Sequence, residues 1–142
     1  MDGGIEPIED DELLYRRIPV SMGWFVANRL SAQAFGPRKD ELTGISVFRE
    51  KYKSLEDAAR GKSKQGYYVA VLRAGDLRHR GIEVVPRPNL PDGQYDPAHA
   101  ELPDLNAATY TDDITLERQR ILAEELCLRV EGPFQTRGGE SA

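Results

Sequence analysis

The chain has 142 residues, of which 39% are hydrophobic and 30% are charged, and its formal net charge is -5. A chain of this length can fold as one domain around a hydrophobic core, without a disulfide or a structural metal. Its one cysteine, Cys127, and its two histidines exclude an intrachain disulfide and the usual nitrogen and sulfur zinc site. The apolar runs are far shorter than the roughly 20 residues of a membrane-spanning helix, and the N-terminus is acidic where a signal peptide is basic. We therefore expect a cytoplasmic protein that uses no membrane, metal or cofactor.

The charges fall into three blocks along the chain. Residues 1–12 hold six acids and no base, residues 13–89 hold 15 bases and 7 acids, and residues 90–142 hold 4 bases and 11 acids. In one interpretation the acidic arm folds back on the basic segment, or the end blocks only keep the protein in solution. In the other, the basic side chains form one patch that binds phosphates, nucleic acid or an acidic protein, with the arm as a competitor. That patch would contain Arg16, Arg17, Arg38, Lys39, Arg49, Lys51, Lys53, Lys62 and Lys64.

The domain organisation follows from the distribution of apolar residues. Residues 1–12 contain too few apolar groups to offset the entropy of ordering, which predicts a disordered acidic arm. Removing this arm should then leave the melting temperature nearly unchanged. We expect one α+β domain over residues 13–134 and a disordered tail over residues 135–142.

The first half of the domain is predicted to be mainly β-structure. Residues 13–20 favour a strand, joined in a hairpin by the Met22-Gly23 turn to a second strand at residues 24–26. A short helix or an irregular connection follows at residues 30–35, and weak alternation predicts another strand at residues 45–48.

The next segments alternate between helix and strand. A helix should begin at the capping residue Ser54 and end near Gly61. Residues 67–72 form the strongest strand, which is apolar on both faces and therefore central in its sheet. A single helical turn at residues 74–81 leads directly into a strand at residues 82–85. This connection is too short for a usual parallel crossover, which argues against a doubly wound sheet.

The last third should contain a long loop and a helix. Four prolines predict a surface loop over residues 87–110. A helix should begin at Asp112 or Asp113 and continue to residue 130, because apolar residues recur there at helical spacing. The predicted buried stripe consists of Leu116, Ala123, Leu126, Cys127 and Val130. These elements predict an α+β fold: a curved antiparallel or mixed sheet of about five strands, with the C-terminal helix packed on one face.

His99 is one candidate for a catalytic acid or base, because it lies within the predicted proline-rich loop, where functional groups are often presented. Asp96, three residues earlier, would then orient its ring. The alternative is that His99 bonds to backbone carbonyls and only holds the loop. No Gly-x-Ser-x-Gly elbow, glycine-rich phosphate loop or complete set of nucleophile, base and orienting residue is visible in the sequence.

Arg16 and Arg17 are the other two candidates. Adjacent strand residues point to opposite faces of a sheet, so at most one of the two faces a solvated side if the other face is covered. A guanidinium directed into a cleft is suited to binding a carboxylate or phosphate by its two-pronged geometry. The alternative is a local ion pair or a solvated strand edge.

Several short segments together give a weak resemblance to known proteins. Residues 14–17, 31–35, 45–47, 74–78 and 96–100 resemble in their spacing short, uncharacterised bacterial proteins, a resemblance that implies no function. More distantly, the chain resembles ADP-ribosyltransferase-type folds, which place an arginine on their first strand and a serine on the next main strand. Arg16 and Ser46 match these two positions. The catalytic glutamate and the histidine of those folds have no assigned counterpart here.

Two hypotheses of function follow. The first is a non-enzymatic bacterial binding module that acts within a larger assembly, with a protein partner or nucleic acid held by the basic segment and the proline-rich loop. The second is a small enzyme acting on a nucleotide or another phosphate-bearing substrate, with Arg16 or Arg17 as the anion clamp and His99 as the acid or base. The two hypotheses differ on whether His99 and an arginine line one pocket.

Overall fold

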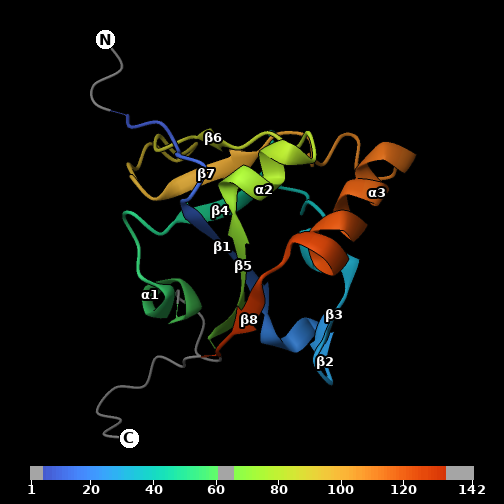
Figure 1. The fold of residues 1–142 in the computed structure, drawn as a ribbon. Coiled ribbons are helices and arrows are strands. Elements are labelled where there is room, and N and C mark those ends of the chain that lie inside the picture. The colour runs from blue at the N-terminus through green and yellow to red at the C-terminus, as the bar shows by residue number, and fades with distance from the viewer. Residues whose placement is uncertain (1–4, 61–65, 134–142) are drawn as a thin grey trace, which may run out of the picture.

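The computed structural model describes residues 5–60 and 66–133. Within these residues it is an α+β domain (Figure 1). Its strands are β1 (Leu13–Pro19), β2 (Phe25–Val26), β3 (Arg29–Leu30), β4 (Ile45–Arg49), β5 (Tyr67–Arg73), β6 (Val85–Pro86), β7 (His99–Leu102) and β8 (Arg129–Glu131). Its helices are α1 (Leu55–Arg60), α2 (Ala74–His79) and α3 (Asp113–Ile121), with short 3-10 turns η1 (Val20–Met22) and η2 (Ala32–Phe35) and a π-helical turn η3 (Leu122–Leu126). No helix among these is long and apolar enough to cross a membrane.

The main sheet has six antiparallel strands in the order β6-β7-β4-β1-β5-β8, and β2 pairs only with β3. β1 pairs with β5 along all seven of its residues, from Leu13 opposite Arg73 to Pro19 opposite Tyr67. With β4 it pairs at only two positions, Leu14 with Arg49 and Tyr15 with Phe48. The two strands therefore separate beyond Tyr15, near the middle of the sheet.

One face of the sheet carries α1. Ser54 caps this helix by accepting a hydrogen bond from the Asp57 amide at 3.1 Å, as its sequence predicts. Ala58 and Ala59 are fully buried and form a small apolar cluster with side chains of β1 and β5. Because α1 has only six residues, the β4 and β7 part of this face is left without a helix.

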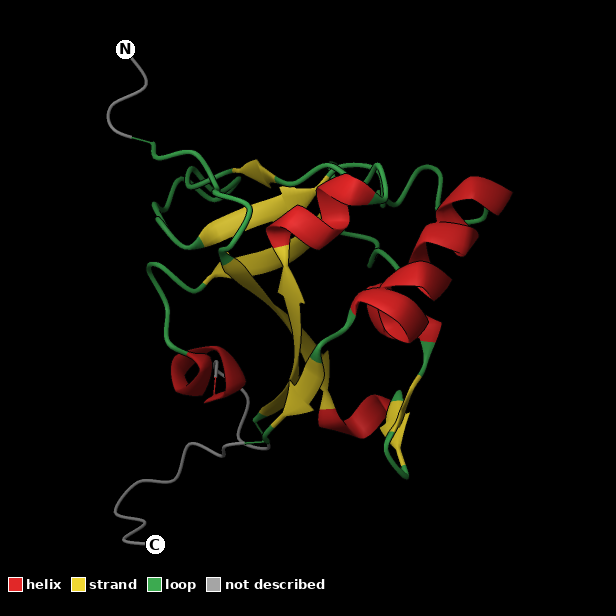
Figure 2. Cartoon of the chain, viewed as in Figure 1, coloured by secondary structure: helices red, strands yellow, loops and turns green. Residues whose placement is uncertain are grey.

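The other face carries the main core, and Figures 1 and 2 show α1 and α3 on opposite sides of the sheet. Phe35 of η2 and Leu122 of η3 are fully buried there against Leu14 and Ile18 of β1. The predicted α+β class and the packing of the C-terminal helix on one face are confirmed, with six strands in the main sheet where about five were expected.

Three predicted elements are wrong. The strand predicted at residues 82–85 is reduced to β6, which contains only Val85 and Pro86. β1 forms no hairpin with residues 24–26, because β2 turns back on β3 through Ala27 and Asn28, which both have positive φ. The predicted loop over residues 87–110 contains β7, which pairs with β4. All four β7 residues are buried, and they alternate polar and apolar side chains, but the run is only four residues long and lies within the proline-rich segment.

The C-terminal helix is shorter than predicted. The regular helix ends at Ile121, and Val130 lies in β8, which pairs with β5. Leu116 is 48% exposed, whereas Thr115 and Gln119 are buried. The remaining members of the predicted stripe, Ala123, Leu126, Cys127 and Val130, are partly buried and pack against the core.

Residues 5–12, which the sequence assigns to a disordered arm, lie against the domain. Ile8 is 4% exposed and belongs to the main core. The Arg49 side chain is 1% exposed and donates to the Glu6 carbonyl at 2.7 Å and to both Glu12 carboxylate oxygens at 3.0 Å. A buried arginine binds this segment, and no local sequence signal predicts that partner. Residues 1–4 and 135–142 lie outside the described residues.

Candidate functional site

A pocket of about 540 Å³ opens on the α1 face of the sheet, where that helix leaves β4 and β7 uncovered. Its lining brings together all three residues that the sequence singled out for chemistry. We name this pocket the sheet pocket. Its lining includes Arg16, Arg17, Ser46, Phe48, Tyr67 and His99. Its volume is within the range of pockets that bind small molecules.

Ser46 and His99 form a hydrogen-bonded pair in the sheet pocket. The His99 Nδ1 lies 2.8 Å from the Arg87 carbonyl, and a carbonyl can only accept a hydrogen bond. Nδ1 therefore carries the proton of the neutral ring, and the unprotonated Nε2 accepts from the Ser46 hydroxyl at 2.9 Å. The ring is oriented by the Arg87 carbonyl, whereas Asp96 Oδ1 accepts from the Ala98 amide at 2.9 Å. The prediction that Asp96 orients the ring is wrong.

The sheet register places this pair. In β4, Ile45 and Val47 face the core, so Ser46 and Phe48 face the pocket. β7 pairs with β4 so that His99 lies opposite Phe48, two residues along the ladder from Ser46 and on the same face. The His99 side chain therefore reaches Ser46 diagonally across two strands.

Arg16 is fully occupied by the protein. Its guanidinium has five N–H donors, and five hydrogen bonds use them. Nε donates to the Ala34 carbonyl at 3.0 Å, Nη1 to the Ser46 carbonyl at 3.1 Å and to Glu41 at 2.8 Å, and Nη2 to the Gly36 carbonyl at 3.2 Å and to Glu41 at 3.3 Å. Arg16 therefore lines the pocket without a donor left for an anion.

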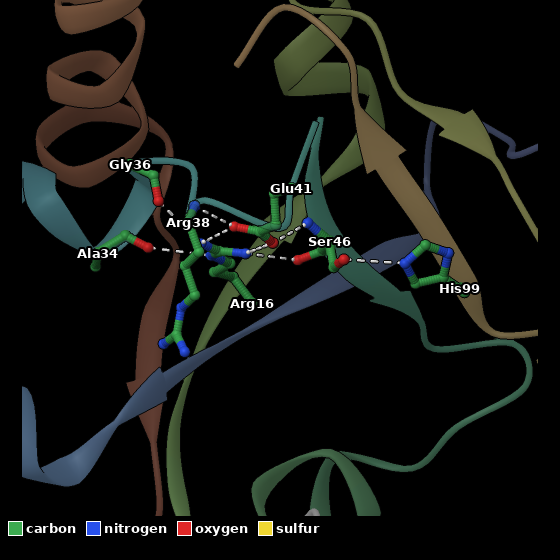
Figure 3. Close-up of polar contacts among 7 residues, drawn as sticks. All are labelled: Arg16, Ala34, Gly36, Arg38, Glu41, Ser46 and His99. Carbon is green, nitrogen blue, oxygen red and sulfur yellow. Dashed lines mark hydrogen bonds and ion pairs between the residues drawn. The ribbon is translucent and has the colours of Figure 1, made fainter. Parts of the chain in front are cut away.

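The Arg16–Glu41 pair takes the place of the missing β1–β4 backbone bonds at Ser46. Arg16 binds the Ser46 carbonyl, and a Glu41 carboxylate oxygen accepts from the Ser46 amide at 2.8 Å (Figure 3). Burial raises the pKa of the Glu41 carboxyl, but the Arg16 charge and the amide donors outweigh burial, so that the pKa lies below its ordinary value. The pair thus fixes the Ser46 backbone where the two strands separate.

Arg17 differs from its neighbour because only part of its guanidinium is used. Nε donates to the Ala58 carbonyl at 2.7 Å, and the guanidinium carbon lies 4.3 Å from the centre of the Phe48 ring and 5.4 Å from that of Tyr67. Among the described residues, no hydrogen bond or ion pair involves Nη1 or Nη2 of Arg17. Burial lowers the pKa of this guanidinium, and nearby Tyr67 and Asp96 partly offset that effect. An anion bound at Nη1 and Nη2 would compensate the partly buried charge.

Glu101 adds a carboxylate to the pocket wall. It lies opposite Ser46 in the β4–β7 ladder and is 8% exposed. Its Oε1 accepts from the Thr43 hydroxyl at 2.8 Å and lies 3.0 Å from Arg87 Nε. Glu101 is therefore held in place by two partners from different loops.

Of the other residues of the predicted basic patch that the structure describes, Arg38 alone lines the sheet pocket. Arg38 and Lys39 are exposed, and the Arg38 side chain lines the pocket while extending away from Ser46 and His99 (Figure 3). Arg49 is bound to residues 6–12, and Lys51 pairs with Glu6 at 2.7 Å. Several of these cations are thus neutralised within the protein.

Two further members of that patch have different surroundings. Lys53 lies 3.9 Å from Asp96 and 4.9 Å from the centre of the Phe48 ring. Lys62 and Lys64 lie outside the described residues.

Sequence reasoning missed Phe48, Tyr67 and Glu101, and it named Ser46 only through the distant likeness to ADP-ribosyltransferase-type folds, without its pairing to His99. Ser46 and His99 are 53 residues apart and have no shared motif, so only the β4–β7 register brings them together. Alternation in residues 45–48 is the one local signal, because it places Ser46 and Phe48 on the same face. The described residues contain no cluster of three histidine, cysteine or acidic side chains that could hold a metal ion.

Comparisons of the chain with protein families, with curated proteins and with solved structures found no match. The chemistry of the site is therefore argued from its own geometry.

Proposed function

We propose that this protein is a small enzyme acting on a nucleotide or another phosphate-bearing small molecule bound in the sheet pocket. The observation that carries the proposal is the convergence of Arg17 with the Ser46–His99 pair in that pocket. Such convergence separates this hypothesis from a non-enzymatic module, because one substrate can then reach both an anion-binding group and a proton acceptor.

Each of these residues supports a separate part of the proposal. Arg17 is anchored through Nε and stacked on Phe48, so its outer nitrogens are held ready for two oxygens of a phosphate. Tyr67 adds aromatic surface to the pocket on which a planar base can stack. His99 is held in the tautomer whose free Nε2 accepts a proton, which is the state a general base requires.

The binding experiment uses purified full-length protein with ribonucleoside mono-, di- and triphosphates and inorganic phosphate. We expect at least one to raise the melting temperature and to bind in calorimetry. Arg17→Gln should weaken this binding tenfold or more, whereas Arg60→Gln, at an exposed arginine of α1 outside the pocket, should not. Failure of every compound, or equal binding by Arg17→Gln, would overturn the proposal.

Catalysis is tested on the compounds that bind. Mass spectrometry of the reaction mixture should show a product, and His99→Ala should reduce turnover by roughly 10² to 10⁴-fold, the usual contribution of a general acid or base. Binding with no product would leave a ligand-binding module in place of an enzyme.

The first sequence hypothesis, a non-enzymatic bacterial component in the cytoplasm with a protein or nucleic acid partner, stays a prediction. The internal pairing of Arg49, Lys51 and Lys53 leaves fewer free cations for that partner than the composition indicates. The likeness to ADP-ribosyltransferase-type folds also stays a prediction. Arg16 and Ser46 lie on neighbouring strands as that likeness implies, but all five donors of Arg16 are already used.

A further inference from the structure

We infer that Ser46 is a nucleophile, and that the sheet pocket transfers a phosphoryl group to its hydroxyl oxygen. The inference rests on the proposed function for the choice of a phosphate-bearing substrate. It adds a covalent step that the binding of such a substrate does not require.

The first argument is the hydrogen-bond chain Ser46–His99–Arg87. A serine hydroxyl is a weak nucleophile unless a base lies within hydrogen-bond distance and is itself oriented. His99 Nε2 meets the first condition at 2.9 Å, and the Arg87 carbonyl meets the second at 2.8 Å. His99 is only 8% exposed, so few water molecules compete for its ring.

The second argument is that the Ser46 backbone is held separately from its side chain. The Glu41 carboxylate binds the Ser46 amide and the Arg16 guanidinium binds the Ser46 carbonyl, and these side chains are only 10% and 5% exposed. The hydroxyl is therefore presented from a fixed backbone, which reduces the entropic cost of reaching an attacking geometry. Among the described residues, the hydroxyl has His99 as its hydrogen-bond partner.

The third argument is access and charge. Ser46 is partly exposed and lines the sheet pocket together with Arg17. Arg17 donates to α1 and stacks on Phe48, which places it on the same face of the sheet as Ser46 and Phe48. A phosphoryl group bound at Arg17 therefore lies on the same face as the Ser46 hydroxyl, where the guanidinium can stabilise negative charge on its oxygens.

The step conserves atoms and charge. The Ser46 Oγ attacks phosphorus, the bond from phosphorus to the leaving oxygen breaks, and the hydroxyl proton passes to His99 Nε2 and then to the leaving oxygen. Water then attacks the phosphorus and gives a proton to His99, the bond from phosphorus to Oγ breaks, and the proton passes from His99 to Oγ, which regenerates the hydroxyl. This second half returns the enzyme to its starting state with inorganic phosphate or a substituted phosphate as product.

The experiment uses a fluorophosphonate probe, which needs no knowledge of the natural substrate. Attack by Ser46 forms an oxygen–phosphorus bond and breaks the phosphorus–fluorine bond, releasing fluoride while the proton passes to His99. Intact mass and peptide mapping should show a single adduct on Ser46. Ser46→Ala should abolish it, and both His99→Ala and His99→Gln should slow it at least tenfold.

Ser54→Ala is the matched control, because it removes an exposed serine that only caps α1 and should leave labelling unchanged. Melting curves identify any variant that is unfolded, and His99→Gln preserves side-chain bulk if His99→Ala does not fold. An unlabelled Ser46 in the wild type, or labelling that does not depend on His99, overturns the inference.

The outcome also separates the two proposals. If a nucleotide binds but no adduct forms, the proposed function stands and the inference that Ser46 is a nucleophile is overturned. If an adduct forms but no phosphate-bearing compound binds, Ser46 is a reactive serine, and both the proposed function and the assignment to phosphoryl transfer are overturned. If a nucleotide binds and the adduct forms, prior addition of that nucleotide should slow labelling, and equal rates would overturn the shared pocket.

Discussion

Arg16 and Arg17 are adjacent on β1 and show two different uses of the same side chain. Arg16 extends toward η2 and Glu41 and gives all five donors to the protein, whereas Arg17, among the described residues, gives only Nε to α1 and stacks on Phe48. Arg49, which holds residues 6–12, resembles Arg16. The comparison shows that a buried arginine can bind a ligand only if some of its guanidinium N–H groups are not already used by the protein.

The largest effect is expected at Arg49. Removal of residues 1–12 takes away its partners and the buried Ile8 side chain. An uncompensated buried charge costs about 3–5 kcal/mol and loss of one buried aliphatic side chain about 2 kcal/mol. Urea denaturation should show this loss for the truncated protein. Glu12→Ala should reproduce most of this loss, whereas Glu9→Ala, at an exposed position, should not. An unchanged urea midpoint after truncation would show that residues 5–12 are a disordered arm.

The Arg16–Glu41 pair should come next. Arg16→Ala or Glu41→Ala leaves one buried partner unpaired, which should lower the free energy of unfolding by about 3–5 kcal/mol. Arg17→Ala should cost only about 1–2 kcal/mol, because one hydrogen bond and a cation–π contact are lost. Equal losses at the two positions would remove the distinction between them. A double-mutant cycle of Arg16 and Glu41 measures the coupling directly.

Acid should reproduce part of the loss at Glu41. The pKa of its carboxyl is lowered in the folded protein, so its stabilising effect is present above the unfolded value and is lost as the pH falls through the folded value. The unfolding free energy, measured between pH 6 and pH 2, should therefore fall less steeply in Glu41→Gln than in the wild type. Parallel curves would show that Glu41 does not contribute to the pH dependence.

Arg17 should affect ligand binding more than stability. Hydrogen bonds to a charged group contribute about 1.5–3 kcal/mol, so Arg17→Gln should weaken nucleotide binding roughly tenfold to hundredfold. The melting temperature of the free protein should fall by only a few degrees, in line with the loss of one hydrogen bond and a cation–π contact. Calorimetry on the two single variants Arg17→Gln and Arg38→Gln distinguishes the two causes. Weaker binding in Arg17→Gln alone assigns the affinity to its guanidinium, and equally weak binding in both assigns it to general positive charge at the pocket.

The smallest effect is expected at the exposed pair of Glu6 and Lys51. Glu6 also accepts from the Tyr52 hydroxyl at 2.6 Å, but both the Glu6 and Lys51 side chains are about half exposed. Solvated ion pairs contribute little to stability and are screened by salt. Glu6→Gln should leave the melting temperature unchanged in physiological salt. A clear decrease would show that the Glu6 carboxylate contributes to stability together with the buried Arg49 network.

Local signals predicted the elements whose determinants are local. The cap at Ser54, the apolar run of β5 and the helical turn after Arg73 are all found close to their predicted positions. β7 was missed because its polar and apolar alternation covers only four residues and follows Pro97 in a proline-rich segment. The binding of Arg49 to residues 6–12 has no local signal, because the partners are about 40 residues apart.

The candidate site was predicted only in part. Strand alternation correctly placed Arg16 and Arg17 on opposite faces, and both line the pocket with His99. Which arginine keeps free donors depends on Glu41 and on the carbonyl groups around η2, and this follows from tertiary structure alone. The partner of His99 depends on the β4–β7 register, because a shift by one residue would turn Ser46 into the core.

The position of β1 has a consequence for synthesis on the ribosome. β1 lies in the interior of the sheet and is made before both of its partners, β4, which begins at Ile45, and β5, which begins at Tyr67. A nascent chain therefore presents β1 with two unpaired edges until β4 emerges, and with one until β5 emerges. Chains that stop before β5 should therefore aggregate or require a chaperone, whereas loss of β8 removes only an edge strand.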